Sequence, residues 1–215
     1  MFTLDRYRDE LLRLHDHICP RQILGLRIGE LAGRLLGVSL PQRGKNKRLL
    51  ALVETDGCFA DGVMVATGCS LGHRTLRLID QGKVAVTFVD TAGDLSVGLR
   101  IWPRPTIRTL AQKLSPDAHS RWHAQLEVYQ RLPDDVLLAC AEVELLISVR
   151  QLLSRPHVRV TCQQCGEEVI NEREVKAEGQ VLCLHCAGEA YYTKRHAGPV
   201  ADLPATVIAQ AERHR

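Results

Sequence analysis

The stretch Cys162-Gln163-Gln164-Cys165, separated by seventeen residues from Cys183-Leu184-His185-Cys186, decides the fold of the C-terminal part of this chain. Each Cys-x-x-Cys pair can place two sulfur atoms around one ion, and the spacing is typical of a zinc ribbon, a closed site with four thiolate ligands. The segment has too little apolar material to bury a core of its own, so metal binding would supply its folding energy. The alternatives are two disulfides or free thiols. A closed four-thiolate site has no open coordination position, so it stabilises a fold and does not catalyse.

The length and composition of the chain indicate one sizeable core with a small appendage. It has 215 residues, 45% hydrophobic and 25% charged, which is ordinary for a soluble globular protein. We expect a metal-binding domain over 1–155, the zinc ribbon over 156–192 and a tail with a short helix over 193–215. No run of apolar residues is long enough to span a membrane or resembles a signal peptide, so we expect a cytoplasmic protein without a membrane partner. Eight cysteines in such a protein favour metal or thiol chemistry over disulfides.

Charge and aromatic content disfavour a nucleic-acid partner. The formal net charge of +3 is too small to argue for a polyanionic ligand, and an aromatic content of 4% leaves few rings on which bases could stack. A third class of function, a zinc ribbon that binds nucleic acid or protein as a regulator, therefore lacks the basic or aromatic surface that it would need.

Hydrophobic periodicity and turn residues predict an α+β fold for the larger domain. Gly37 and Gly68 are placed to end helices, and Asp56 is placed to cap one at its start. The predicted helices cover 4–17, 20–36, 58–67 and 118–131, and a short terminal helix is expected near 205–213. The predicted strands cover 49–53, 84–89, 97–102 and 140–149, with 84–89 and 97–102 forming a hairpin, and in the ribbon 167–170 paired with 180–182.

A second group of candidate metal ligands lies near the N-terminus, in the segment His15-Asp16-His17-Ile18-Cys19-Pro20. On a continuous helix His15 and Cys19 would share a face, whereas a bend before Pro20 would let His17 and Cys19 converge. Either pair could chelate an ion, with Asp16 as an acceptor that orients a histidine ring. The alternative is that these are surface histidines beside a cysteine that is buried as a small apolar residue.

Three further cysteines differ in their predicted surroundings. Cys58 follows an apolar strand and opens a predicted helix, where the helix dipole favours the thiolate and lowers its pKa. Cys69 lies at the far end of that helix, roughly 16 Å away, and is therefore a weaker candidate for the same ion. Cys140 lies in an apolar run and is predicted to be a core residue.

The order and spacing of these segments resemble the FmdE family, which is named for a subunit of formylmethanofuran dehydrogenase. The resemblance covers about residues 10 to 150, and the ribbon is similar to the zinc-binding domain that many members carry. The segments that carry it are His15-x-His17-x-Cys19-Pro20 with Gly25 downstream, Val53-Glu54-x-Asp56-x-Cys58-x-x-Asp61, Thr67-Gly68-Cys69-Ser70-Leu71-Gly72 and the aromatic strand around Phe88.

The resemblance implies an α+β N-terminal domain, a homodimer and a metal-binding cleft of cysteine and histidine, without implying a reaction. The chain departs from the family pattern in two segments. The family's HGHxCPG is replaced by residues 15–21, which lack both glycines, and His73 replaces the lysine that usually follows the GCTxG segment. These changes keep the candidate ligands but alter the charge and backbone freedom of the cleft.

The sequence therefore favours a metal-binding accessory protein of molybdenum- or tungsten-dependent oxidoreductase biology. Thiolate and imidazole ligands suit zinc, nickel or another borderline-soft ion in the cleft. The runner-up is a metal-dependent enzyme that uses the same cleft through an open coordination position, with Cys58, Asp61 or Glu54 in catalytic roles and either carboxylate as proton carrier. The candidate cleft ligands are His15, His17, Cys19 and Cys58.

Overall fold

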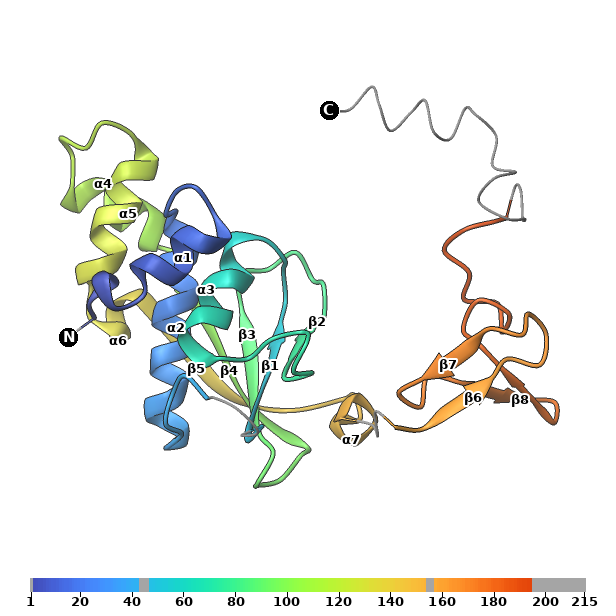
Figure 1. Cartoon of the computed structure of the whole chain (residues 1–215). Coiled ribbons are helices and arrows are strands. Elements are labelled where there is room, and N and C mark those ends of the chain that lie inside the picture. The colour runs from blue at the N-terminus through green and yellow to red at the C-terminus, as the bar shows by residue number, and fades with distance from the viewer. Residues whose placement is uncertain (1, 43–46, 154–156, 195–215) are drawn as a thin grey trace, which may run out of the picture. The chain divides into compact units, whose positions relative to one another are not determined.

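The computed structural model describes residues 2–42, 47–153 and 157–194, shown in Figure 1. The chain divides into two compact units, one from Met1 to Leu153 and one that begins at Ser154. In the described part of the chain, no helix is both long enough and apolar enough to cross a bilayer.

The first unit combines one mixed sheet with helices, as the predicted α+β class requires. Its helical elements are a short 3-10 helix (Leu4–Arg6), α1 (Arg8–Leu14), α2 (Pro20–Leu36), α3 (Cys58–Thr67), α4 (Ile107–Leu114), α5 (Arg121–Arg131), α6 (Asp134–Leu137) and α7 (Val149–Leu153). Its strands are β1 (Leu49–Val53), β2 (Leu76–Leu78), β3 (Val86–Asp90), β4 (Val97–Pro103) and β5 (Leu138–Glu144).

The sheet has the strand order β2-β1-β3-β4-β5. Only β2 runs parallel to its neighbour β1, and the other pairs are antiparallel. The predicted hairpin is confirmed: β3 and β4 pair with Phe88 opposite Leu99, and the chain turns between them at residues 91–96. Phe88 also lies opposite Ala51 of β1, which places the aromatic strand at the centre of the sheet.

Helices α2 and α3 cover one face of the sheet, as Figure 1 shows. The main core lies between these helices and the sheet. Ile23, Leu26 and Val63 from the helices are fully buried in the same cluster as Ala51 and Phe88 from the strands. The opposite face carries a smaller cluster, in which Leu50, Leu52 and Val89 pack against Val149 of α7. The central strand β1 is therefore buried on both faces, which explains its continuous apolar sequence.

Several predicted boundaries are confirmed because glycine and proline fix them locally. Helix α2 begins at Pro20, and Gly37 and Gly68 end α2 and α3 in the left-handed conformation. The N-terminal helix is shorter than predicted, because α1 ends at Leu14 and the chain becomes extended at His15. The predicted cap at Asp56 is wrong: Gly57 occupies the capping position, with φ of 71° and no side-chain hydrogen bond.

The prediction that Cys140 is a core residue is also wrong. Cys140 lies on β5, which is at the edge of the sheet and has β4 as its one neighbour among the described strands. Its position opposite the buried Ile101 shows that it shares the helix-covered face, yet its side chain is exposed. A strand with one neighbour has an open flank, so an apolar sequence there does not guarantee burial.

The described residues of the second unit form two separate hairpins. Strand β6 (Arg159–Thr161) pairs with β7 (Glu168–Ile170), and β8 (Val175–Ala177) pairs with β9 (Gln180–Leu182). The predicted pairing of 167–170 with 180–182 is therefore wrong, because each strand pairs with its neighbour along the chain across a short turn. The predicted helix near 205–213 lies outside the described residues.

Helices α2 and α3 approach so closely at Gly25 and Gly62 that neither position has room for a side chain. A Cβ atom on Gly25 would collide with the carbonyl oxygen of Phe59 and would lie 2.7 Å from the amide nitrogen of Val63. A Cβ atom on Gly62 would collide with the carbonyl oxygen of Gln22 and would lie 3.0 Å from its carbonyl carbon. Both clashes are with backbone, which cannot rotate away, so the two glycines fix the spacing of the helices.

We predict that Gly25→Ala and Gly62→Ala each lower the free energy of unfolding by about 3 kcal/mol, the upper end of the usual cost of overpacking. Alanine in place of glycine within an unhindered helix would instead stabilise by about 0.5–1 kcal/mol, so the sign of the change tests the contact. Urea denaturation measures it. Gly72→Ala is the control, because a Cβ there meets nothing within 4 Å. An unchanged or increased stability of Gly25→Ala would contradict the close approach.

Candidate metal centres

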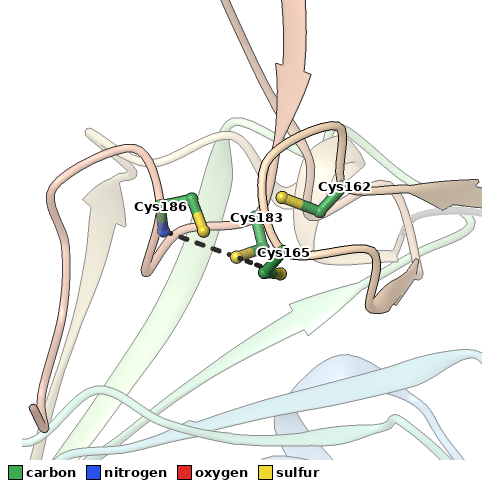
Figure 2. A group of neighbouring side chains, drawn as sticks. All are labelled: Cys162, Cys165, Cys183 and Cys186. Carbon is green, nitrogen blue, oxygen red and sulfur yellow. Dashed lines mark hydrogen bonds between the residues drawn. The ribbon is translucent and has the colours of Figure 1, made fainter. Parts of the chain in front are cut away.

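The four cysteines of the second unit form one compact cluster, shown in Figure 2. The sulfur atoms of Cys162, Cys165, Cys183 and Cys186 all lie within 4.8 Å of one another. The sulfur atoms of Cys165 and Cys183 are 3.9 Å apart. Tetrahedral zinc with Zn–S bonds of about 2.3 Å requires sulfur atoms about 3.8 Å apart, so the spacing fits a single ion.

Local turns place the four sulfur atoms. Gly166, with φ of 77°, lets the chain reverse after Cys165, and its amide donates to the carbonyl oxygen of Cys162 at 2.9 Å. In the second pair, the amide of Cys186 donates to the sulfur of Cys183 at 3.4 Å. The two turns are joined because the amide of Gln163 donates to the carbonyl oxygen of Val181 at 2.9 Å.

In the absence of a metal, the pKa values of the thiols in this cluster differ from one another. Amide groups of Cys165 and Cys183 lower the pKa of Cys162 to about 6, so that this sulfur is a thiolate at neutral pH. Burial and the neighbouring Cys183 sulfur raise the pKa of Cys186 to about 12. Four sulfur atoms at this spacing cannot all be charged unless a cation neutralises them, which is what a divalent metal provides.

The ligands also form part of the core of the second unit. Among its described residues, the buried cluster consists of Cys162, Val169 and Leu182, and the other three cysteines pack against it. Without a cation, this cluster would bring sulfur atoms together with little apolar area to offset the entropy of folding.

We predict that Cys162→Ser removes the metal from this cluster and unfolds the described residues of the second unit, while residues 2–153 stay folded. The reason is that metal binding supplies the folding energy of so small a core. Amide hydrogen exchange of the variant measures this for each unit separately. Retention of a stoichiometric ion in the cluster by the variant would show that four thiolates are not required.

The second candidate centre lies where α2 and α3 begin. Cys19 immediately precedes α2, where its amide donates to Gln22 Oε1 at 2.8 Å, and Cys58 is the first residue of α3. The two thiols are neighbours: burial raises the pKa of Cys58, and the hydrogen bond and charge of Cys19 raise it further. The predicted lowering of the Cys58 pKa is therefore wrong for the metal-free site, because burial and the second thiol outweigh the helix terminus.

Each of the two histidines is paired with a carboxylate, and only the partner of His15 is shown to act on the thiol pair. His15 Nε2 is 2.6 Å from Asp61 Oδ2, and Asp61, one turn after Cys58 on α3, acts on the Cys58 thiol through its charge. His17 Nδ1 is 2.7 Å from Asp16 Oδ1, at an exposed position, and the His15 and His17 ring centroids are 6.3 Å apart. The expected second partner of a ligating histidine is thus present for both rings.

These groups do not form a closed ligand set. Among the described residues, the four C-terminal cysteines are the only set of three or more potential ligands whose donor atoms all lie within 4.8 Å of one another. Cys69 is fully buried, next to Gln42 Nε2 at 3.3 Å. Glu54, a candidate proton carrier, instead accepts two hydrogen bonds from Arg100, at 2.6 and 2.8 Å.

A cleft of about 710 Å³ lies beside the thiol pair. Sequence reasoning found Cys19 and Cys58 but missed the residues that complete the lining, because they come from the end of β4 and from α4 and α5. The two prolines that flank Arg104, at positions 103 and 105, are a local signal that marks this segment. The lining consists of Cys19, Pro20, Arg21, Leu24, Cys58, Val84, Pro103, Arg104, Pro105, Ile107, Arg108, Trp122, Gln125 and Tyr129.

Fold and sites together define a mixed α/β domain with a thiol-lined cleft, followed by a small cysteine-cluster unit. The sequence model of the family described as "FmdE, Molybdenum formylmethanofuran dehydrogenase operon" matches residues 14–139. The chain belongs to the FmdE family.

A solved structure and a curated relative are similar to the chain. The crystal structure of a tungsten formylmethanofuran dehydrogenase FmdE-like protein from Syntrophus aciditrophicus has a TM-score of 0.56 and 21% identity, covering 89% of this chain and 96% of that one. This likeness shows a shared fold. A probable S-adenosyl-L-methionine-binding protein of Archaeoglobus fulgidus is 33% identical over 193 residues, covering 82% of this chain. The chain spans about half of that relative, 51% of its length.

We predict that Cys19→Ala speeds alkylation of Cys58 several-fold in the metal-free protein at about pH 8. Removing the Cys19 thiol removes a group that raises the pKa of Cys58, so more of Cys58 is thiolate at a given pH. In the unmodified chain, Cys58 should label more slowly than the exposed Cys140. Mass-resolved labelling across pH measures both, with Cys69→Ala as control. Unchanged labelling of Cys58 in Cys19→Ala would contradict the contact between the thiols.

Proposed function

We propose that this chain is a zinc-containing accessory protein of molybdenum- or tungsten-dependent oxidoreductase biology, and that its cleft holds a second metal ion. The observation that carries the proposal is the pairing of Cys19 with Cys58 beside an open cleft, within an FmdE-family domain. The link to such an oxidoreductase is supported by the family's name and by the description of the Syntrophus protein.

The residues of the cleft fit a borderline-soft metal such as zinc or nickel. Cys19 and Cys58 would supply two thiolates, which suit such ions, and a histidine of the N-terminal segment would supply an imidazole. His17 is the better placed of the two histidines to turn inward, because its side chain is exposed and its only bond among the described residues is to exposed Asp16. His15 is already held by Asp61. A metal held by so few side chains would keep an open position and could polarise a bound group.

We infer different tasks for the two centres. The cysteine cluster of the second unit uses four protein ligands, which leaves no position for a substrate. It would therefore hold a structural zinc. The cleft lies against folded helices, since α2 and α3 are packed by the apolar core and need no metal to form. An ion there would be free to serve binding, delivery or chemistry.

A second candidate function, a metal-dependent enzyme, is favoured by the pair of His15 and Asp61. Their 2.6 Å contact lies next to Cys58 and could transfer a proton to or from a group bound in the cleft. Asp61→Asn would then abolish turnover but keep the metal, whereas an accessory protein has no turnover to lose.

The proposal includes a homodimer, on the family resemblance and on the prevalence of two-fold oligomers. Sedimentation of the intact chain at micromolar concentration tests it, and a monomer would contradict it. The proposed oxidoreductase partner is tested by capturing the tagged chain from its own cells. A captured complex that contains neither molybdenum nor tungsten would contradict the proposed association.

We predict one ion in each centre, lost independently. Cys58→Ala and Cys19→Ala should each remove the cleft ion and keep the zinc of the cysteine cluster, whereas Cys162→Ser should do the reverse. Element-resolved mass spectrometry of the intact protein measures both ions and identifies them. Cys69→Ala is the matched control, since Cys69 is a fully buried thiol within the core. If Cys58→Ala and Cys69→Ala contain the same metals as the unmodified chain, the cleft is not a metal centre.

A further inference from the structure

The charged side chains that line the cleft beside Cys19 and Cys58 are all positive. Three arginines line it, Arg21, Arg104 and Arg108. No aspartate or glutamate is among its lining residues, all of which belong to the described part of the chain. Elsewhere in the first unit, arginines pair with carboxylates, as Arg48 does with Asp90 and Arg100 with Glu54.

The three cleft arginines are exposed and form no ion pair with a carboxylate of the described residues. Within the described residues, neither Arg21 nor Arg108 lies within 4.0 Å of a carboxylate oxygen. Arg104 is held by two neutral acceptors, because its Nε donates to the carbonyl oxygens of Asp135 at 2.8 Å and Leu138 at 3.1 Å. Guanidinium groups left unpaired around one cavity form a site for an anion, since each can offer two parallel donors to a carboxylate or phosphate.

Helix termini add to the same potential. Pro20, Cys58 and Ile107, the first residues of α2, α3 and α4, all line the cleft. The N-terminal end of a helix carries a partial positive charge and unpaired amide groups, so three such ends around one cavity favour negative charge inside it.

Apart from Gln125, the rest of the lining is largely apolar and includes a large ring. Leu24 and Tyr129 are buried in the wall, and Trp122 leaves 39% of its surface exposed. The cavity of about 710 Å³ has the size of a small-molecule site rather than of a protein groove. A flat apolar group could lie against Trp122 while its charged end meets the arginines.

We propose that the cleft binds a small organic anion. Arg21 and Arg108 hold its carboxylate or phosphate, its apolar body lies against Trp122, and its other end faces Cys19 and Cys58. This site goes beyond the proposed function and does not depend on it, because none of the groups that hold the anion is a metal ligand. If Cys19 and Cys58 also hold a metal, the bound anion would lie next to that metal.

The test uses 1-naphthoate, 1-naphthyl phosphate and the neutral 1-naphthamide as probes, titrated into the intact chain by calorimetry. We expect at least one anion to bind about tenfold or more tightly than the amide, with the stronger of the two anions showing whether the site suits carboxylate or phosphate. Arg21→Glu and Arg108→Glu should each weaken anion binding about tenfold or more and leave amide binding unchanged. Neither side chain has a hydrogen-bonded partner in the described chain, so circular dichroism should show both variants folded.

Arg150→Glu is the matched control, since it makes the same charge change at an exposed position of α7 outside the cleft lining. Equal binding of anions and amide, an equal loss in Arg150→Glu, or no binding at millimolar concentration would each overturn the proposal. The titrations are repeated with Cys58→Ala. If Cys58→Ala still binds the anion, the anion site is supported, whether or not the variant contains a metal. If Cys58→Ala loses the cleft metal and still binds the anion, the metal proposal and the anion proposal are both supported.

Discussion

The close backbone approach of α2 and α3 at Gly25 and Gly62 is the constraint on which the first unit depends. A Cβ atom at either position would collide with the backbone of the other helix, so no side chain separates the helices there. Gly25 faces Phe59 and Val63, and Gly29 further along α2 faces Ala66 further along α3, so the two helices run in the same direction. Their N-termini therefore meet at one end. That geometry brings Cys19 next to Cys58 although thirty-eight residues separate them in the sequence.

The two cysteine sites differ in whether the fold around them depends on the bound ion. In the second unit the four cysteines make up much of a small core with Val169 and Leu182, so the fold and the ion would form together. In the first unit the thiol pair lies on a frame already stabilised by apolar burial on both faces of β1. A site on a preformed frame can stay incomplete, with a position open to another molecule, because the fold does not depend on filling it.

The charge of the cleft follows from where its arginines come from. Arg21 lies in the first turn of α2. Arg104 directly follows β4, and Arg108 lies in the first turn of α4. Backbone carbonyl groups near β5 hold Arg104 through its Nε alone, which does not cancel the charge of the guanidinium. The chain thus combines two thiols, a concentration of positive charge and the ring of Trp122 in one cavity. This combination suits an accessory protein that handles a small charged molecule at least as well as one that handles an ion alone.

The sequence by itself determined the features that arise from short-range constraints. The four-cysteine cluster, the start of α2 at Pro20 and the ends of two helices at Gly37 and Gly68 follow from spacing, ring closure and the left-handed backbone that glycine tolerates. The tertiary structure alone decided the rest. Cys140 is exposed because it lies on an edge strand, which has an open flank. Glu54 forms an ion pair with Arg100 of β4, a residue far from it in the sequence. The tertiary structure also raised the pKa of Cys58, because burial beside Cys19 depends on a helix contact that no local pattern in the sequence encodes.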